Sequence, residues 1–129
     1  MIDEGIYSRL NTYAGTSALV SGRIYPDILP QNPTYPAITY SRISAVRVDN
    51  LGSFSGSARV RYQFDCWHTN PTTARSVRKQ VRLAMDGFNG TFASCVVSGA
   101  RLLNEWDSFE DEAKVYRRGA DYEIWHKEE

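Results

Sequence analysis

The chain has 129 residues, 42% of them hydrophobic, and its 15 basic and 15 acidic residues cancel. This length supports one hydrophobic core and is short for two, so we expect a single domain over 1–129. A neutral chain has no overall field that would draw it onto nucleic acid or an anionic membrane, so any charge effect must be local. No apolar run approaches the roughly 20 residues that a membrane span needs, which predicts no membrane partner.

The two cysteines, Cys66 and Cys95, lie within apolar patterns typical of strands, and no secretory signal precedes them. Small buried cysteines behave as hydrophobic side chains. We therefore expect buried reduced thiols rather than a disulfide, in a soluble protein made in a reducing cytosol.

The first segment, 3–13, is expected to form a short amphipathic helix, because its apolar residues recur at helical spacing. Gly15 and the Thr16-Ser17 pair are expected to end this helix. A group of prolines then follows, and their fixed φ angles and missing N–H groups argue against a central strand or a helix. We expect an extended strap over the surface at Pro26, Pro30, Pro33 and Pro36.

The segment from Ala37 to Val46 is typical of a strand, with a phase slip before Ile43 that predicts a bulge near Arg42. This strand should pair with a second strand that begins at Ala58.

Between these two strands lies the segment 47–57, which is longer than the roughly 2–5 residues of most hairpin loops. It is rich in glycine and serine, yet it also carries Leu51 and Phe54. Large apolar side chains in such a loop either fold back onto the subunit or meet another chain. We treat Leu51 and Phe54 as a candidate docking arm.

The clearest strand and the clearest helix follow one another. From 58 to 67 apolar and polar residues alternate, as in a strand with one buried face. Asn70 can then cap a helix whose first residue is Pro71, where a missing N–H costs nothing. Apolar residues recur three or four apart as far as Phe88, and Gly87 is placed to end the helix in a left-handed conformation. This helix should pack across the apolar face of the strand.

Beyond the helix, the segment 94–103 is rich in valine and leucine and predicts a third strand. The next segment, Glu105 to Glu112, holds five carboxylates and no basic residue. It lacks the turn glycine and the ligand spacing of a calcium loop, so we expect a solvated acidic loop. A last strand is expected over 113–126. Together these elements predict an α+β fold, with an antiparallel sheet of about four strands and helices packed on one face.

Residues with catalytic potential are few. His68 and His126 lack the spacing of a metal site, and no P-loop, G-x-G-x-x-G or G-x-S-x-G motif is present. Cys66 and His68 would share the buried face of one strand, which favours a structural cysteine. The residues thus supply no recognised catalytic motif, and we expect no metal and no cofactor. The alternative is a small ligand-binding or enzymatic domain, for which a cleft near Trp67, His68 and His126 would be needed.

Four basic residues fall largely on the side of the helix opposite its apolar stripe, namely Arg75, Arg78, Lys79 and Arg82. The interleaved aromatic residues of a nucleic-acid platform are missing, so direct binding of nucleic acid is not favoured. A basic helix and an acidic loop on one neutral chain instead suit a head-to-tail interface, in which one subunit's loop meets the next subunit's helix. The acidic members of this candidate lateral interface are Glu110, Asp111 and Glu112.

The run from Leu19 to Tyr40 contains G-R-I-Y-P-D, then P-Q, then Y-P-A-I-T-Y. A strand ending in Asp65-Cys66-Trp67, a helix over 74–88 and a last strand rich in aromatic residues follow. This order resembles the tail completion, or tail terminator, family of tailed bacteriophages and prophages over nearly the whole chain. The first motif is fairly specific, whereas the others are generic when taken alone. The acidic segment 105–112 matches no motif of that family.

The resemblance implies a non-enzymatic α+β subunit of a ring, usually of six copies. Such a ring caps the finished tail tube and joins it to the head connector in the virion, after assembly in the cytoplasm of a bacterial host. DNA would pass through the lumen of the ring without specific binding. The lumen is also an alternative place for the carboxylates of 105–112, where they would repel phosphates.

Overall fold

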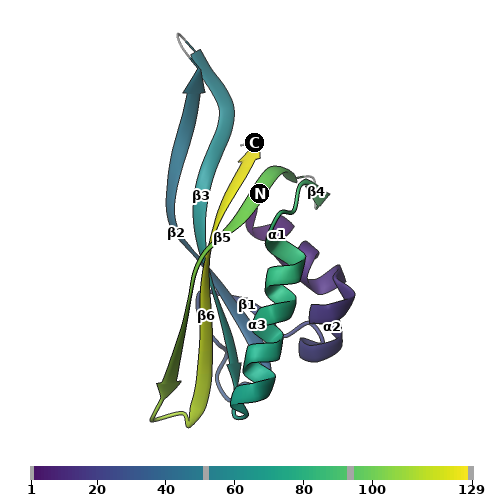
Figure 1. Ribbon diagram of the computed structural model, residues 1–129, viewed down its shortest axis with the longest axis vertical. Helices are drawn as coiled ribbons and strands as arrows, with labels where there is room; N and C mark the ends of the chain where they lie inside the picture. The colour runs from purple at the N-terminus through teal and green to yellow at the C-terminus, as the bar shows by residue number, and fades with distance from the viewer. Residues whose placement is uncertain (1, 51–52, 93–94, 128–129) are drawn as a thin grey trace.

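The computed structural model describes residues 2–50, 53–92 and 95–127. These residues form an α+β fold of three helices and a curled six-stranded sheet (Figure 1). The helices are α1 (Ile2–Thr12), α2 (Ala14–Val20) and α3 (Pro71–Met85). The strands are β1 (Ile24–Pro26), β2 (Ala37–Asn50), β3 (Ser53–His68), β4 (Gly90–Phe92), β5 (Cys95–Glu110) and β6 (Val115–Lys127). Within the described ranges, no helix is long and apolar enough to cross a membrane.

The strand order of the sheet is β1-β2-β3-β6-β5-β4. β1 runs parallel to β2, and the other pairs of neighbouring strands are antiparallel. The predicted α+β class is confirmed, but the sheet has six strands rather than about four. The two additional strands, β1 and β4, have three residues each, which is too short for an alternating pattern to be recognised in the sequence.

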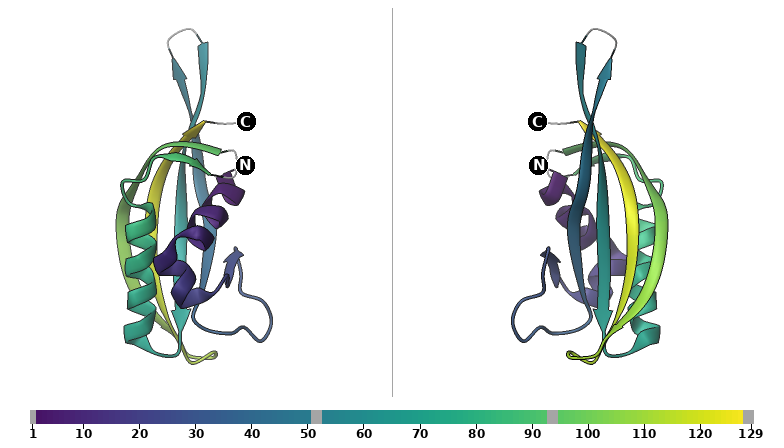
Figure 2. Two further views of the ribbon diagram at one scale, coloured as in Figure 1. Left: turned by 90° about the vertical axis from the view of Figure 1, so that its right-hand side faces the viewer. Right: turned by 90° about the vertical axis from the view of Figure 1, so that its left-hand side faces the viewer.

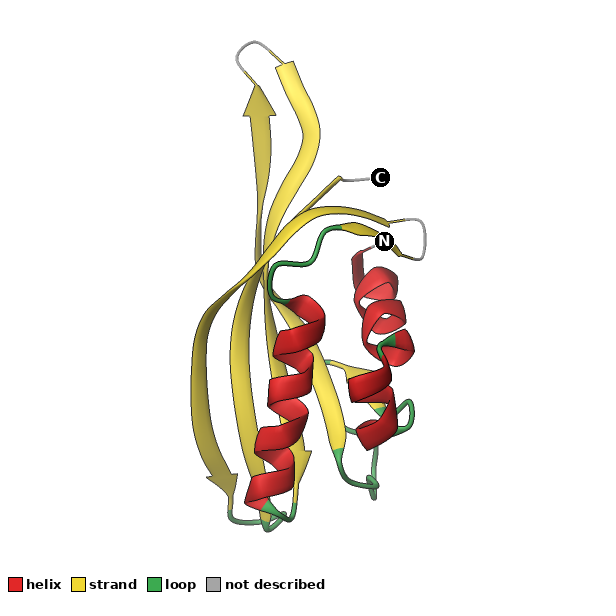
Figure 3. Ribbon diagram, turned by 45° about the vertical axis from the view of Figure 1, so that its right-hand side comes forward, coloured by secondary structure: helices red, strands yellow, loops and turns green. Residues whose placement is uncertain are grey.

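The three helices lie on one face of the sheet, and the other face is uncovered (Figures 2 and 3). The largest buried side chains between the two layers are aromatic. The rings of Phe64 and Tyr122 pack edge to face, with 5.3 Å between their centroids. Val77 and Val81 of α3 are fully buried against them. Each such side chain contributes roughly 1.5–3 kcal/mol by leaving water, so this layer supplies most of the fold's stability.

The N-terminal segment holds two helices, so the prediction that Gly15 and the Thr16-Ser17 pair end the first helix is wrong. The chain bends at Tyr13 and continues as α2, which contains all three residues. Thr16 is fully buried, and its hydroxyl donates to the carbonyl oxygens of Leu10 and Tyr13. Burial in this setting outweighs the weak helix propensities of glycine, threonine and serine.

The proline-rich segment follows the edge of the sheet as expected, with one short strand inside it. β1 ends at Pro26 and pairs with one neighbour, β2, in the described sheet. An edge position tolerates proline, because the missing N–H would have no partner there.

β2 and β3 form one long antiparallel pair with the predicted bulge, since the register shifts between Arg42 and Ser44. The expected loop over 47–57 is wrong, because both strands continue into it and Asn50 pairs with Ser53. The pair therefore projects beyond the rest of the sheet as a two-stranded ribbon (Figure 1). Leu51 lies outside the described residues, and Phe54 is placed by its backbone opposite Asp49, so the docking arm stays a prediction.

α3 begins as predicted, because the Asn70 side chain accepts hydrogen bonds from the backbone of Thr72 and Thr73 at 2.9 and 3.1 Å. The helix ends at Met85, three residues earlier than the apolar spacing suggested. Gly87 has a φ of +78°, in the left-handed region, but it follows an extended Asp86 and lies outside the helix.

The acidic segment 105–112 is largely strand, so its prediction as a solvated loop is wrong. β5 runs to Glu110, and the turn to β6 occupies 111–114. The strand is extended here by pairing with β6, whose partner residues include Ala120 for Glu105 and Val115 for Glu110. Cross-strand pairing outweighs the low strand propensity of acidic residues.

Candidate functional site

The two histidines lie at opposite ends of the central strand pair. His68 is paired with Tyr116, whereas His126 is paired with Ala58, ten positions away along β3. At the rise of a strand this separation is about 33 Å. The alternative of a cleft near Trp67, His68 and His126 is therefore wrong. No group of three potential metal ligands occurs within 2–50, 53–92 and 95–127.

Both cysteines are buried and neither forms a disulfide in the described part of the chain, as expected from the sequence. Burial raises the pKa of the Cys66 thiol, and the neighbouring charge of Asp65 acts in the same direction. A thiol held protonated in this way is a poor nucleophile, which fits a structural role.

The basic side of α3 is tied to β5 of the same subunit through Arg78. This side chain is 12% exposed and contacts the carboxylates of Glu105 at 3.2 Å and Asp107 at 2.7 Å. It also donates to the backbone oxygen of Trp106 at 2.9 Å. Part of the charge complementarity seen in the sequence is thus satisfied within one subunit.

The pKa of Asp107 reflects this arrangement. Desolvation alone would raise it, but the hydrogen bond and charge of Arg78, together with the charges of Arg118 and Arg75, lower it overall. The Arg118 Nε lies 3.6 Å and the Arg75 guanidinium 4.0 Å from the Asp107 carboxylate. Asp107 therefore joins α3, β5 and β6 as an ionised group.

The other residues of the predicted lateral interface lie in two regions, on α3 and near the turn between β5 and β6. Lys79 and Arg82 are exposed on α3, where with Arg75, Arg78 and Glu105 they line a shallow groove of about 210 Å³. Asp111 and Glu112 are exposed in the turn between β5 and β6, while Glu110 pairs with Arg117 of its own subunit at 3.2 Å. The structure does not bring the turn carboxylates to the basic groove within one subunit.

The uncovered face of the sheet carries a layer of paired charges that the sequence analysis did not single out. Arg59 and Arg101 both contact the carboxylate of Glu123 at 3.1 Å, and Arg61 contacts Asp121. The carboxylates are close to the sheet and largely buried, with the Glu123 side chain 15% exposed. The arginines are more exposed, with the Arg101 side chain 64% exposed. This face therefore presents guanidinium groups to the solvent.

The layer continues toward the other end of the sheet. Arg117 pairs with Asp65 at 2.9 Å and lies 5.3 Å from the ring of Trp67. Burial alone would lower the pKa of Arg117, but its hydrogen bonds to Asp65 and Glu110 and their charges raise it overall. The sequence signal for this layer was the cross-strand match of basic positions on β3 with acidic positions on β6.

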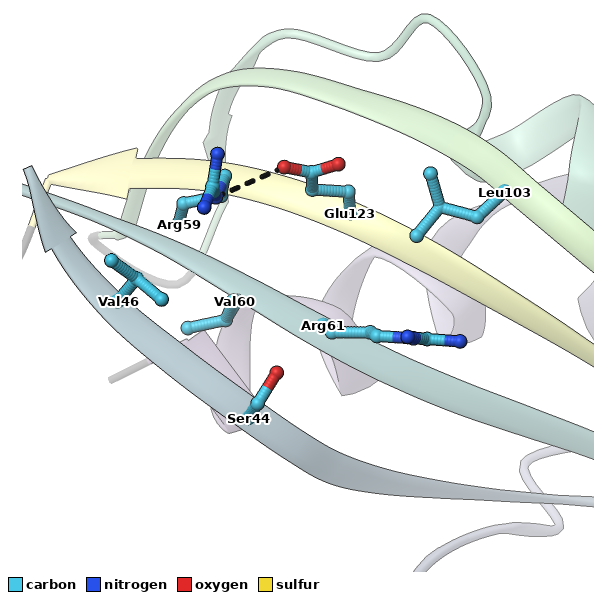
Figure 4. Close-up of a pocket in the computed structure, with 7 residues that line it drawn as sticks. All are labelled: Ser44, Val46, Arg59, Val60, Arg61, Leu103 and Glu123. Carbon is cyan, nitrogen blue, oxygen red and sulfur yellow. Dashed lines mark ion pairs between the residues drawn. The ribbon is translucent and has the colours of Figure 1, made fainter.

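A pocket of about 280 Å³ opens on this face (Figure 4). Val46 and Leu103 stand on opposite sides of the Arg59–Glu123 ion pair, and both are exposed. Such a wide, shallow hollow suits a side chain of another protein better than an enclosed small molecule. Among the described residues, the surfaces offer contacts and no catalytic constellation.

The chain is similar in sequence to one protein family and in fold to a chain of a solved structure. Residues 4–127 match the model of the family described as tail completion protein gp17. A chain in the solved structure of the virion of a native gene transfer agent particle has a similar fold, with a TM-score of 0.78 and 16% sequence identity. The similarity covers 95% of this chain and 92% of that one. No curated protein sequence matches.

Proposed function

The chain belongs to the tail completion protein gp17 family, which is a structural and non-enzymatic family, and on that basis we propose a specific place for it in a virion. It forms, as a single domain, one subunit of a ring of six copies. The ring caps the head-proximal end of the tail tube and joins it to the head connector. DNA passes through the lumen without specific binding.

The observation that carries this proposal is the extent of the family match, which runs from residue 4 to residue 127 and so includes all the described helices and strands except the first two residues of α1. The similar chain in the gene transfer agent virion supports the fold of the whole subunit.

Lateral contacts between copies are carried by charges that form no ion pair with the other described residues of the subunit. Lys79 and Arg82 line the basic groove on α3, and Asp111 and Glu112 are exposed at the β5–β6 turn. Surfaces of opposite charge at separate places on one chain suit a heterologous interface that closes into a ring. The groove of one copy takes the turn of the next.

Arg75, Arg78 and Glu110 belong to the same surfaces but hold pairs within the subunit. Their reversal would disturb the fold and the interface together. Lys79, Arg82, Asp111 and Glu112 are therefore the better residues for a test.

The ribbon formed by the ends of β2 and β3 is the candidate arm for the tube or the connector, with Leu51 and Phe54 as its apolar contacts. Its projection beyond the sheet gives it reach, because it extends past the last residue of β6 (Figure 1). Docking of large apolar side chains on a partner removes them from water.

Electron microscopy and native mass measurement, with and without purified tail tubes, test the ring. We expect closed rings on tube ends, and their absence under both conditions would contradict the proposal. Lys79→Glu with Arg82→Glu should weaken the ring, as should Asp111→Lys with Glu112→Lys. The combined charge swap should restore it, which controls for damage to each surface.

The same variants separate lateral contact from a lumen position for the turn carboxylates. If Asp111 and Glu112 face the lumen, Asp111→Lys with Glu112→Lys leaves the mass of the ring unchanged. Such a ring would instead retain DNA, because lysines in the lumen attract phosphates.

A further inference from the structure

The outer edge of β5 is closed off by its own subunit. β4 pairs with this edge only from Cys95 to Val97. Beyond that point the Asp86 carboxylate accepts from the Leu102 backbone N–H at 3.0 Å, and the Ala100 oxygen accepts from Gly87 at 2.8 Å.

The Asp86 side chain and the segment after α3 thus occupy backbone groups at 100–102 that another strand would need. Proteins protect sheet edges in this way against pairing with other chains.

The outer edge of β2, in contrast, is covered over only part of its length. β1 pairs with it from Ile38 to Tyr40, and the Tyr40 oxygen also accepts from Asp27. Within the described residues, nothing hydrogen-bonds to this edge from Arg42 to Val46. Ile43 and Val46 lie along it and are 51% and 48% exposed. An open edge flanked by apolar side chains is a template for pairing.

The other side of the same ribbon is open as well. β6 pairs with β3 only as far as Ser57, so residues 53–56 have β2 as their single described neighbour. An isolated two-stranded ribbon is marginally stable in water. Among the described residues, the projecting ribbon therefore has one edge without a neighbouring strand on β2 and one on β3.

We propose that these two free edges pair between copies of this chain, the β2 edge of one subunit with the end of β3 in the next. This inference rests on the proposed ring. Copies in a ring are related by rotation about one axis, and the proposal has the ribbons project along that axis, so that every β2 runs in one direction along it and every β3 in the other. β2 of one copy thus lies antiparallel to β3 of its neighbour, as within the subunit.

A second copy is the occupant that the structure favours, because the same ribbon supplies both the edge and the strand. Each subunit gives one strand and receives one, so ring closure leaves no unpaired ribbon. The capping of β5 over 95–102 disfavours the competing arrangement in which neighbouring sheets join through that part of β5. Continuous pairing also explains how a ribbon of two strands becomes stable.

Disulfide cross-linking between introduced cysteines tests the pairing. Ser44→Cys on β2 is combined in one chain with Ser53→Cys or Ser55→Cys on β3, because the register between copies is what the scan determines. Directly opposed residues of antiparallel strands have Cα atoms about 4.5–5.5 Å apart, within disulfide range. The native cysteines are buried and do not compete. Asn104→Cys on β5, with the same scan, is the matched control.

We expect at least one β2–β3 combination to give a ladder of cross-linked species that ends at the ring, and the Asn104→Cys series to give none. Rings that form while every β2–β3 combination stays uncross-linked, or that cross-link through Asn104→Cys, would overturn the pairing and leave the ring intact. Absence of rings by native mass, with and without tubes, would overturn the proposed function and this inference with it.

Hydrogen exchange on the unmodified chain gives an independent measurement. Backbone amides of 42–50 should exchange more slowly in the ring than in the monomer, because pairing buries them in a ladder. Equal exchange of this segment in both states would contradict the pairing even if cross-links were found.

Discussion

Gly119 of β6 lies directly beneath the indole of Trp106 of β5, its cross-strand partner. A Cβ placed on Gly119 would lie 2.6 Å from Cζ2 of that ring, closer than real Cβ contacts allow. Gly119→Ala should therefore displace the indole from the sheet. We expect a loss of about 1–3 kcal/mol in the free energy of unfolding, as for other overpacked sites, measured by denaturant titration.

Gly99 is the matched control, because a Cβ there would lie 3.8 Å from Trp125, an ordinary contact. Gly99→Ala should leave stability unchanged or slightly higher, since alanine restricts the unfolded chain. In the double variant Gly119→Ala with Trp106→Ala, the two changes should be clearly non-additive. Additive losses would mean that the indole is not what excludes the methyl group.

Arg78 offers a second test of what stabilises the fold. Among the described residues of α3, it is the one that forms ion pairs with two carboxylates of β5, Glu105 and Asp107. Arg78→Ala removes both ion pairs and the hydrogen bond to the Trp106 oxygen. Breaking such a partly buried group should lower the free energy of unfolding by about 1–3 kcal/mol. Arg75→Ala, which removes a solvent-exposed contact 4.0 Å long, should change it by less than about 0.5 kcal/mol. Thermal or denaturant unfolding of the two variants distinguishes them.

The ion pair between Arg78 and Asp107 also makes the stability of the fold depend on pH. The folded pKa of Asp107 is below its ordinary value, so its ionisation stabilises the fold above the unfolded pKa of about 3.9. This contribution is lost as the pH falls from about 4 through the folded value. Unfolding curves between pH 7 and 3 should therefore show a smaller loss of stability for Arg78→Ala than for the unaltered chain. Parallel curves would show that Arg78 does not set the pKa of Asp107.

The sequence predicted those parts of the fold in which periodicity and local capping act together. Asn70 and Pro71 begin α3 where expected, and the phase slip before Ile43 is a real bulge. Both features are decided by residues next to one another in the chain, so no tertiary information was needed to find them.

The errors arose where distant contacts decide the structure. α2 depends on the burial of Thr16 and Val20, and the extension of β5 through Glu105 depends on a partner strand that follows it in the sequence. Arg78, whose contact with a neighbouring copy stays a prediction, meets Asp107 of its own subunit, which the sequence did not indicate. Opposite charges in a sequence indicate complementarity, but they do not say whether the partner belongs to the same chain.

Asp86 gives the last prediction, since its carboxylate is the acceptor for the Leu102 N–H on the outer edge of β5. Asp86→Ala leaves that donor to the solvent and should lower the free energy of unfolding by about 0.5–1.5 kcal/mol. It also uncovers backbone beside Leu103, which is 40% exposed, so concentrated samples should associate more readily by light scattering. Asp86→Asn keeps a side-chain oxygen that can accept the same bond, and it should restore both the stability and the monodispersity. If Asp86→Asn associates as readily as Asp86→Ala, the loss of charge rather than of the edge cap is responsible, and the protection of β5 would have to lie in β4 and Gly87 alone.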